Sequence, residues 1–146
     1  MHTVCVAIDF CAGHRLVGHE GKCANYHGHN YRAEIYASAR ELDDIGRVVD
    51  FSILKKELKR WIDFNWDHGM ILRETDPMVK WCTTQMFSKV YSMADNPTAE
   101  NMARILCDVA ITASSTLPGR LVVIDKVRLF ETPNCFAEYS PLASSI

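Results

Sequence analysis

The amino-acid sequence predicts an α+β domain in which an antiparallel sheet carries two main helices on one face. Two segments near the start, residues 3–12 and 27–38, alternate apolar and polar residues as half-buried strands do. Two segments with helical periodicity follow, over residues 51–63 and 99–114. A β-prone run over residues 121–131, with a returning segment after it, supplies the last pair of strands. Strands that are joined as hairpins at both ends of the chain favour antiparallel pairing.

The first two strands are predicted to bring several functional side chains to one face. One face of the first strand is apolar and carries Val4, Val6, Ile8 and Phe10. Because successive strand residues point to opposite faces, His14 lies on the face of Phe10 and Cys11 on the other. One face of the second strand carries His27, His29, Tyr31, Ala33 and Ile35. The loop between the strands is longer than a tight hairpin requires, and such loops often carry function.

Each predicted helix has an apolar stripe and a capping residue at its start. The first stripe consists of Phe51, Leu54, Leu58, Trp61 and Ile62. The second consists of Met102, Ile105, Leu106, Val109 and Ala113. Asp50 and Thr98 are the expected N-caps, and Glu100 suits the positive end of the second helix. Pro118-Gly119 is predicted to end the helical region.

Shorter elements complete the prediction. The residues Thr132-Pro133-Asn134 are typical of a turn, after which residues 135–140 return as a closing strand. Between the two main helices, residues 76–85 are expected to form a short helix and residues 89–93 a short strand.

Length and composition place the chain among ordinary globular proteins. Its 146 residues suit one domain, spanning residues 1–146, that can assemble as a homo-oligomer. The net charge of −2 gives no electrostatic reason to expect nucleic acid or a membrane surface as partner. No apolar run has the length of a membrane span. The six cysteines have no framework spacing and no export signal precedes them, so reduced thiols in the cytoplasm are expected.

The segment from Cys23 to His29 is the strongest sign of chemistry. His27 and His29 are two residues apart, so in a strand both imidazoles point to one face and can reach one metal ion. His14, at the end of the preceding strand, could supply a third ligand. Three histidines around zinc leave one coordination position for water or substrate, which is the arrangement of a catalytic site.

Three alternatives remain open from the residues alone. Cys23 could be a fourth ligand and close a structural site, although such sites usually draw on more cysteine. His19, in the loop, could replace His14 as a ligand, although a solvated loop histidine is the simpler interpretation. The histidines could also be polar residues at a strand end with no metal.

Two further features suggest a role on weaker grounds. The adjacent Asp67 and His68 could form a proton relay in which the carboxylate orients the imidazole. Glu131, at a strand end beside a turn, could accept two N–H groups from a flat heterocycle. Taken singly, these residues are better explained as a capping aspartate with a surface histidine and as a solvated glutamate.

Together the motifs resemble the 6-pyruvoyltetrahydropterin synthase family, and within it the bacterial 6-carboxytetrahydropterin synthases of the queuosine pathway. The resemblance covers almost the whole chain. Its carriers are Phe10-Cys11-Ala12-Gly13-His14-Arg15-Leu16, the Cys23 to His29 segment, Val49-Asp50-Phe51, Asp67-His68, Pro97-Thr98-Ala99-Glu100-Asn101 and Phe130-Glu131-Thr132.

The resemblance implies a Zn²⁺ ion held by three imidazoles, those of His14, His27 and His29. It implies that Cys23 is the base that abstracts a proton, and that Asp67 and His68 are its partner relay. Glu131 would anchor the pterin and could belong to the relay. The residues expected to line the pterin pocket are Thr98 and Glu100. The implied architecture is the tunnelling fold, a ββααββ unit whose sheets close barrels in a hexamer, a dimer of trimers with active sites between subunits.

The implied reaction is a lyase reaction on 7,8-dihydroneopterin triphosphate, which yields 6-carboxy-5,6,7,8-tetrahydropterin, acetaldehyde and triphosphate. The close spacing of Cys23 and His27 resembles this carboxy branch. The nearest alternative is the pyruvoyl branch, which keeps all the carbons, and a different class of alternative is a non-catalytic zinc- or pterin-binding module. Lys22 and Arg15 are candidate contacts of the triphosphate. Cys11 stands where the family usually has serine or glutamate, and residues 69–95 form a longer connection than in its shortest members.

Overall fold

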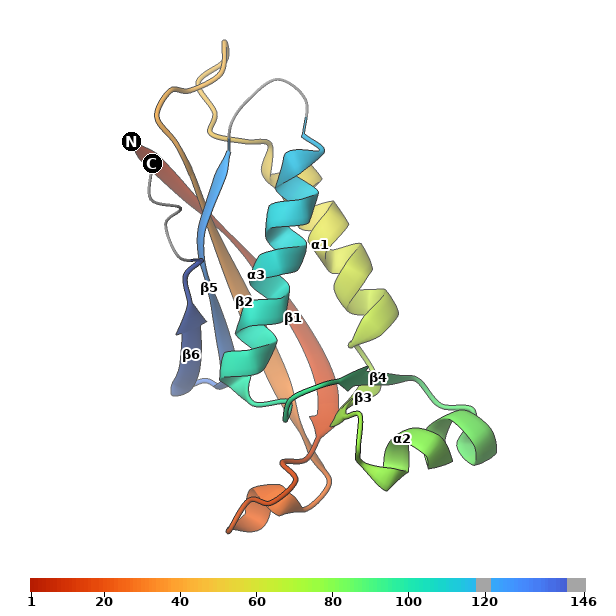
Figure 1. Ribbon diagram of the computed structural model, residues 1–146. Coiled ribbons are helices and arrows are strands. Elements are labelled where there is room, and N and C mark those ends of the chain that lie inside the picture. The colour runs from red at the N-terminus through yellow and green to blue at the C-terminus, as the bar shows by residue number, and fades with distance from the viewer. Residues whose placement is uncertain (118–121, 142–146) are drawn as a thin grey trace.

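The computed structural model describes residues 1–117 and 122–141, and it contains one curled sheet with two long helices packed on one face (Figure 1). Strands β1 (His2–His14) and β2 (His27–Ala39) pair antiparallel along their full length, with His14 opposite His27. Strand β5 (Val123–Thr132) continues the sheet antiparallel to β2, and β6 (Cys135–Tyr139) returns along β5. The expected antiparallel core of four strands is confirmed.

The two long helices are confirmed together with their caps. Helix α1 spans Phe51–Asn65, and the Asp50 side chain accepts a hydrogen bond from the Ser52 N–H. Helix α3 spans Ala99–Ser115, and the Thr98 side chain accepts one from the Asn101 N–H. Their apolar stripes pack on the sheet face that carries Ile8, Phe10 and Tyr31.

The segment between α1 and α3 adds structure that the sequence only partly predicts. Strands β3 (Gly69–Arg73) and β4 (Val90–Met93) extend the sheet beyond β1, and both pairings are parallel, so the order is β4-β3-β1-β2-β5-β6. The sheet is therefore mixed. Between β3 and β4, helix α2 (Pro77–Trp81) runs on into a π-helical turn (Cys82–Met86). The short helix and the second short strand match the expectation, whereas β3 was not predicted.

Strand β3 escapes prediction because its five residues are too few to show a period, and because two consecutive residues, Ile71 and Leu72, are both buried. Because side chains on both faces of β3 are buried, the apolar–polar alternation of a half-buried strand is lost. The predicted helix end at Pro118-Gly119 and the first residue of the 121–131 run lie outside the described residues.

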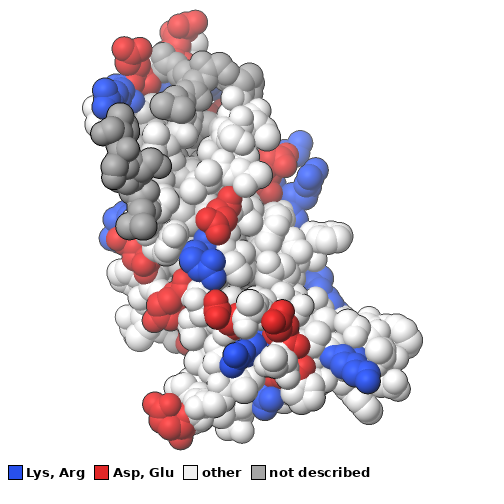
Figure 2. All heavy atoms as spheres, in the orientation of Figure 1, with Lys and Arg blue, Asp and Glu red and all other residues white. Residues whose placement is uncertain are grey.

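The lower end of the sheet in Figure 1 gathers the chain segments that carry the candidate chemistry. There β1 ends, β2 begins, and the loop between them projects beyond the sheet. The start of α3 approaches the same end. On the face shown in Figure 2, acidic and basic side chains alternate without an extended area of one sign. Within the part of the chain that the structure describes, no helix combines the length and apolar content that crossing a bilayer demands.

Candidate metal centre and active site

Three histidines converge where β1 ends and β2 begins. His14 is the last residue of β1, and His27 and His29 lie at the start of β2 on the same face. One ligating nitrogen from each lies within 4.8 Å of the others. Gly28 suits the close approach of β1 and β2 between these histidines, because a side-chain carbon there would lie 3.0 Å from the carbonyl oxygen of Ala12. The two-residue spacing of His27 and His29, with His14 on the paired strand, thus produces a cluster of three nitrogen atoms.

Backbone carbonyls orient two of these imidazoles. The Nδ1–H of His14 donates to the Pro97 carbonyl oxygen at 2.8 Å, and that of His27 donates to the Asn25 carbonyl oxygen at 2.7 Å. Each Nε2 therefore carries a lone pair, and the two Nε2 atoms are 3.2 Å apart. Two lone pairs at this distance repel each other unless a cation lies between them. Nitrogen donors of a tetrahedral zinc ion are about 3.3 Å apart, so the spacing suits a shared metal.

The third imidazole also lacks an ordinary partner. His29 Nε2 is buried without a hydrogen bond, and its nearest acidic atom is Glu131 Oε1 at 3.4 Å. Burial lowers the pKa of both His14 and His29, which favours the neutral form that binds metals. A buried nitrogen with no partner, and burial that favours the neutral form of His14 and His29, fit a metal ion. These three histidines could therefore hold one.

Glu131 and the start of α3 form a pocket next to the histidines. Glu131, Thr98 and Glu100 line a cavity of about 350 Å³, together with Leu16, Cys135, Phe136 and their neighbours. The structure thus brings together the three residues expected to bind the pterin. Glu131 connects this pocket to the histidines, because it lines the cavity and its Oε1 lies 3.4 Å from His29 Nε2.

Cys23 lies in the loop between β1 and β2, near the pocket but outside the histidine cluster. It sits in a single 3-10 turn (Lys22–Ala24) and is half-buried. Its carbonyl oxygen accepts a hydrogen bond from the N–H of Leu16, which lines the pocket. The ligating group of three does not include Cys23, so the geometry does not favour a closed site with a fourth ligand. Nor does it include His19, whose Nδ1 accepts the Gly21 N–H within the loop.

Two side chains from the following segments hold this loop. The buried carboxylate of Asp76 accepts hydrogen bonds from Arg15 Nε at 2.5 Å and from the Tyr26 hydroxyl at 2.7 Å. The side-chain amide of Asn96 bonds to both the N–H and the carbonyl of Val17, at 2.9 and 2.8 Å. The charge of Arg15 is thereby paired with Asp76, which does not favour its proposed contact with a triphosphate.

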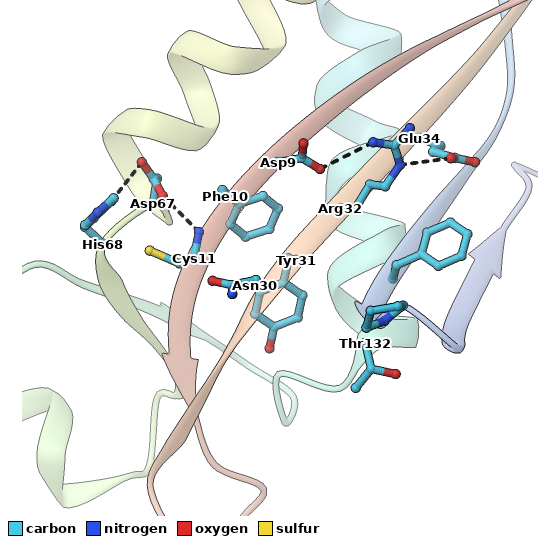
Figure 3. A pocket seen from close by; sticks show the side chains of 12 residues that line it. Asp9, Phe10, Cys11, Asn30, Tyr31, Arg32, Glu34, Asp67, His68 and Thr132 are labelled. Atoms are coloured by element: carbon cyan, nitrogen blue, oxygen red, sulfur yellow. Dashed lines mark hydrogen bonds and ion pairs between the residues drawn. The ribbon is translucent and has the colours of Figure 1, made fainter.

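Asp67 and His68 form a separate cluster on the sheet face turned away from the helices. The His68 Nδ1–H donates to Asp67 Oδ2 at 2.9 Å, and the Cys11 N–H donates to Asp67 Oδ1 at 3.0 Å (Figure 3). Burial opposes ionisation of Asp67, but these hydrogen bonds outweigh it and lower its pKa. The pair borders a pocket of about 710 Å³. Neither this cluster nor the histidine cluster includes Cys23, so the structure does not bring Cys23 and the pair together.

Sequence reasoning missed the partners that orient the site. The carbonyls of Pro97 and Asn25 carry no signal of their own, because every residue has a carbonyl. Asp76 could have been singled out only as the N-cap of α2, where it accepts the Met78 N–H. Cys11 was expected to face away from the histidines, and it does, but its contact with Asp67 depends on β3 and was not foreseen.

Comparisons with known proteins agree on one family. The sequence model of the family described as 6-pyruvoyl tetrahydropterin synthase matches residues 3–141. A protein of Rickettsia felis named 6-carboxy-5,6,7,8-tetrahydropterin synthase is 42% identical over 135 residues, covering 90% of this chain and 94% of that protein. A protein of the same name from Haemophilus influenzae is 32% identical over 146 residues, covering 95% and 99%.

Solved structures share the fold. The 6-pyruvoyl tetrahydropterin synthase of Caenorhabditis elegans superposes with a TM-score of 0.67 at 27% identity, covering 96% of this chain and 95% of that one. An uncharacterized protein of Wolinella succinogenes superposes with a TM-score of 0.77, covering 95% and 97%. At 22% identity, this likeness supports a shared fold and nothing further.

Proposed function

The chain belongs to the 6-pyruvoyl tetrahydropterin synthase family and is a lyase of that family, and from this premise we propose a specific reaction. The proposed substrate is 7,8-dihydroneopterin triphosphate, and the products are 6-carboxy-5,6,7,8-tetrahydropterin, acetaldehyde and triphosphate. The observation that carries the proposal is the pocket of Glu131, Thr98 and Glu100 directly beside three histidines whose free nitrogens face one another. The pocket thus places the Glu131 carboxylate, which can accept N–H groups of a heterocycle, beside a group of histidines that can bind a metal.

His14, His27 and His29 would hold Zn²⁺ in this reaction. The bound ion would supply Lewis acidity to the hydroxyl-bearing side chain of the substrate. The carbonyls of Pro97 and Asn25 keep two imidazoles in the tautomer that ligation needs. The supporting observation is again the buried, unpartnered nitrogen of His29.

The protein residues would recognise the ring and move the protons. Glu131 would accept N–H groups of the pterin, while Thr98 and Glu100 shape the pocket around it. Cys23 would take a proton from the substrate side chain, since a neighbouring cation stabilises a thiolate. His68, oriented by Asp67 at 2.9 Å, would give or take a proton at another atom of the substrate.

We further propose that two copies of the chain complete each active site. Within one chain, Cys23 belongs to neither the histidine cluster nor the Cys11, Asp67 and His68 cluster. In the proposed assembly, Cys23 of one copy and His68 of a neighbouring copy would meet in the proton relay. A hexamer built as a dimer of trimers, in which sheets close into barrels, would provide this contact and cover the sheet edges. Residues 1–146 would form one domain of this assembly.

The carboxy product is favoured over the pyruvoyl product by two observations. The similar proteins of Rickettsia felis and Haemophilus influenzae carry the name of the carboxy enzyme, and Cys23 lies close to His27 in the sequence. The reaction would serve queuosine biosynthesis. The six cysteines are free thiols, which supports a reducing cytoplasmic compartment.

The Cys23→Ala variant tests the catalytic interpretation. The variant should keep its zinc and lose turnover of 7,8-dihydroneopterin triphosphate, because Cys23 would move a proton and would not bind the metal. Zinc content and turnover are measured on the same preparation, with Cys5→Ala as the control for an exposed thiol elsewhere. Loss of zinc together with turnover would favour the non-catalytic zinc module with Cys23 as a ligand.

A further inference from the structure

A second group of metal-ligating atoms lies outside the histidine cluster. Cys11 Sγ, a carboxylate oxygen of Asp67 and a ring nitrogen of His68 lie within 4.8 Å of one another. Sulfur, carboxylate oxygen and imidazole nitrogen are all ligands that zinc accepts. Figure 3 shows the three side chains next to one another beside β1, on the sheet face away from the helices.

The three residues are held together by their own backbone and side chains. Asp67 accepts the Cys11 N–H at 3.0 Å and the His68 Nδ1–H at 2.9 Å. The His68 N–H in turn donates to the Cys11 carbonyl oxygen at 2.7 Å. This last bond supports His68 at φ +59°, a left-handed conformation that costs free energy for a residue with a side chain. The cluster is therefore organised before any ligand binds.

Within one chain, the cluster is also open to ions from solvent. Cys11 and Asp67 are half-buried, and the side chain of His68 is 78% exposed. Cys11 and His68 both border a hollow of about 350 Å³ next to Gly13 and Gly69. Donors of a tetrahedral zinc ion are separated by less than about 4 Å, so the side chains need to close in by at most about 1 Å, which the exposed His68 can do.

We propose that Cys11, Asp67 and His68 form a second binding site for a thiophilic divalent cation such as Zn²⁺. The site is distinct from the histidine cluster in ligands and in sheet face. Binding releases the thiol proton of Cys11, because the thiolate is the ligand. With one neutral and two anionic ligands and a fourth position open, the site suits zinc and cobalt better than magnesium or calcium, which prefer oxygen ligands.

Occupation of this site has a consequence that rests on the proposed function. If Asp67 and His68 form the proton relay, an ion bound to them removes both from proton transfer. Zinc beyond the amount that fills the histidine cluster would then inhibit the enzyme. The cation site itself does not depend on this role.

Cobalt titration of the metal-free protein tests the site without reference to turnover. The wild-type chain should bind two equivalents of Co²⁺ per chain by equilibrium dialysis, and one of them should give a thiolate-to-cobalt absorption band. Cys11→Ser should lose the band and one equivalent, whereas Cys5→Ser, an exposed thiol elsewhere, should keep both. His27→Ala should lose the other equivalent and keep the band.

Three outcomes would overturn the site: a single equivalent in the wild type, an unchanged band in Cys11→Ser, or a band that disappears in Cys23→Ala instead. The inhibition is measured separately, with the turnover of each variant expressed relative to its own value without added Zn²⁺. Excess zinc should inhibit the wild type at least tenfold more strongly than Cys11→Ser. Two bound equivalents without inhibition would leave the cation site standing and remove Asp67 and His68 from the proposed relay.

Discussion

At the histidine cluster, the orientation of each imidazole follows from a carbonyl that belongs to another part of the chain. His14 donates to Pro97, which is 83 positions away, and His27 donates to Asn25. These bonds leave two lone pairs facing each other at 3.2 Å, an arrangement that a bound cation would relieve. The arrangement that could hold a metal is thus built by side chains and backbone together.

Removal of one imidazole should cost the protein its metal. His29→Ala is expected to weaken zinc binding by at least about 100-fold, since even partners of the ligands contribute 10- to 100-fold. Zinc content after dialysis against a weak chelator measures the effect. His19→Ala, a loop histidine outside the cluster, is the control and should retain its zinc. Equal zinc content in the two variants would contradict the ligand assignment.

Glu131 should affect pterin binding and leave the metal in place. Glu131→Gln removes the charge that would accept N–H groups of the ring, and the loss of charge-assisted hydrogen bonds costs about 1.5–3 kcal/mol. Pterin affinity should fall by roughly 10- to 150-fold on this scale, as measured by fluorescence titration. Glu74→Gln, an exposed glutamate near α2, serves as the control. Unchanged affinity in Glu131→Gln would remove this carboxylate from the site.

The sequence predicted the side chains of the site better than their surroundings. Strand parity placed His14, His27 and His29 on one face, because the two-residue period of a strand is local information. The contacts of Pro97 and Asp76 could not be predicted, since they depend on how segments far apart in the sequence pack. The grouping of Cys11 with Asp67 depends on β3, which showed no period of its own.

At the scale of elements, the segment between α1 and α3 supports the loop that carries Cys23. Asp76, at the start of α2, binds Arg15 and Tyr26 on either side of this loop. The Arg15 guanidinium also stacks 4.5 Å from the ring centre of Tyr26. The longer connection of residues 69–95 therefore has a structural role, because it provides the buried carboxylate on which the loop is anchored.

This anchor should make stability depend on pH. Burial opposes ionisation of Asp76, but hydrogen bonds from Met78, Arg15 and Tyr26 outweigh it and lower its pKa below the ordinary value of 3.8. A lowered folded-state pKa stabilises the fold above pH 3.8, and this contribution disappears as the pH falls through the folded-state value.

The Asp76→Asn variant separates this contribution from others. At pH 7 the variant should be about 1–3 kcal/mol less stable than the wild type, because it weakens bonds to a charged acceptor. The difference should shrink as the pH is lowered below 3.8. Urea unfolding across this range provides the measurement, with the exposed Asp44→Asn as control. A difference that stays constant with pH would show that Asp76 does not act through its charge.

At the scale of the whole molecule, one chain carries all the proposed catalytic residues but divides them between two faces of its sheet. The histidine cluster and Glu131 lie on the helix side, and Asp67 and His68 lie on the other. The four-stranded antiparallel core and the two helices were predictable from the sequence, because the apolar period of a long segment indicates both its secondary structure and its buried face. The relation of one copy to the next has no such local signal.

Mixed assemblies test whether active sites are shared between copies. Cys23→Ala and His68→Ala should each be inactive alone. After the two are unfolded together and refolded as a mixture, roughly a quarter of the wild-type activity should return, since random pairing joins intact Cys23 and intact His68 at that frequency. Sedimentation of the same sample reports whether the assembly is a hexamer. Absence of recovery in a correctly assembled mixture would place both residues in one chain's own site.

The central claim is the reaction, and product analysis tests it most directly. Zinc-loaded protein is incubated with 7,8-dihydroneopterin triphosphate, and the products are identified by mass spectrometry. We expect 6-carboxy-5,6,7,8-tetrahydropterin together with acetaldehyde and triphosphate. A 6-pyruvoyl product that keeps all the carbons would contradict the claim and assign the chain to the other branch of its family.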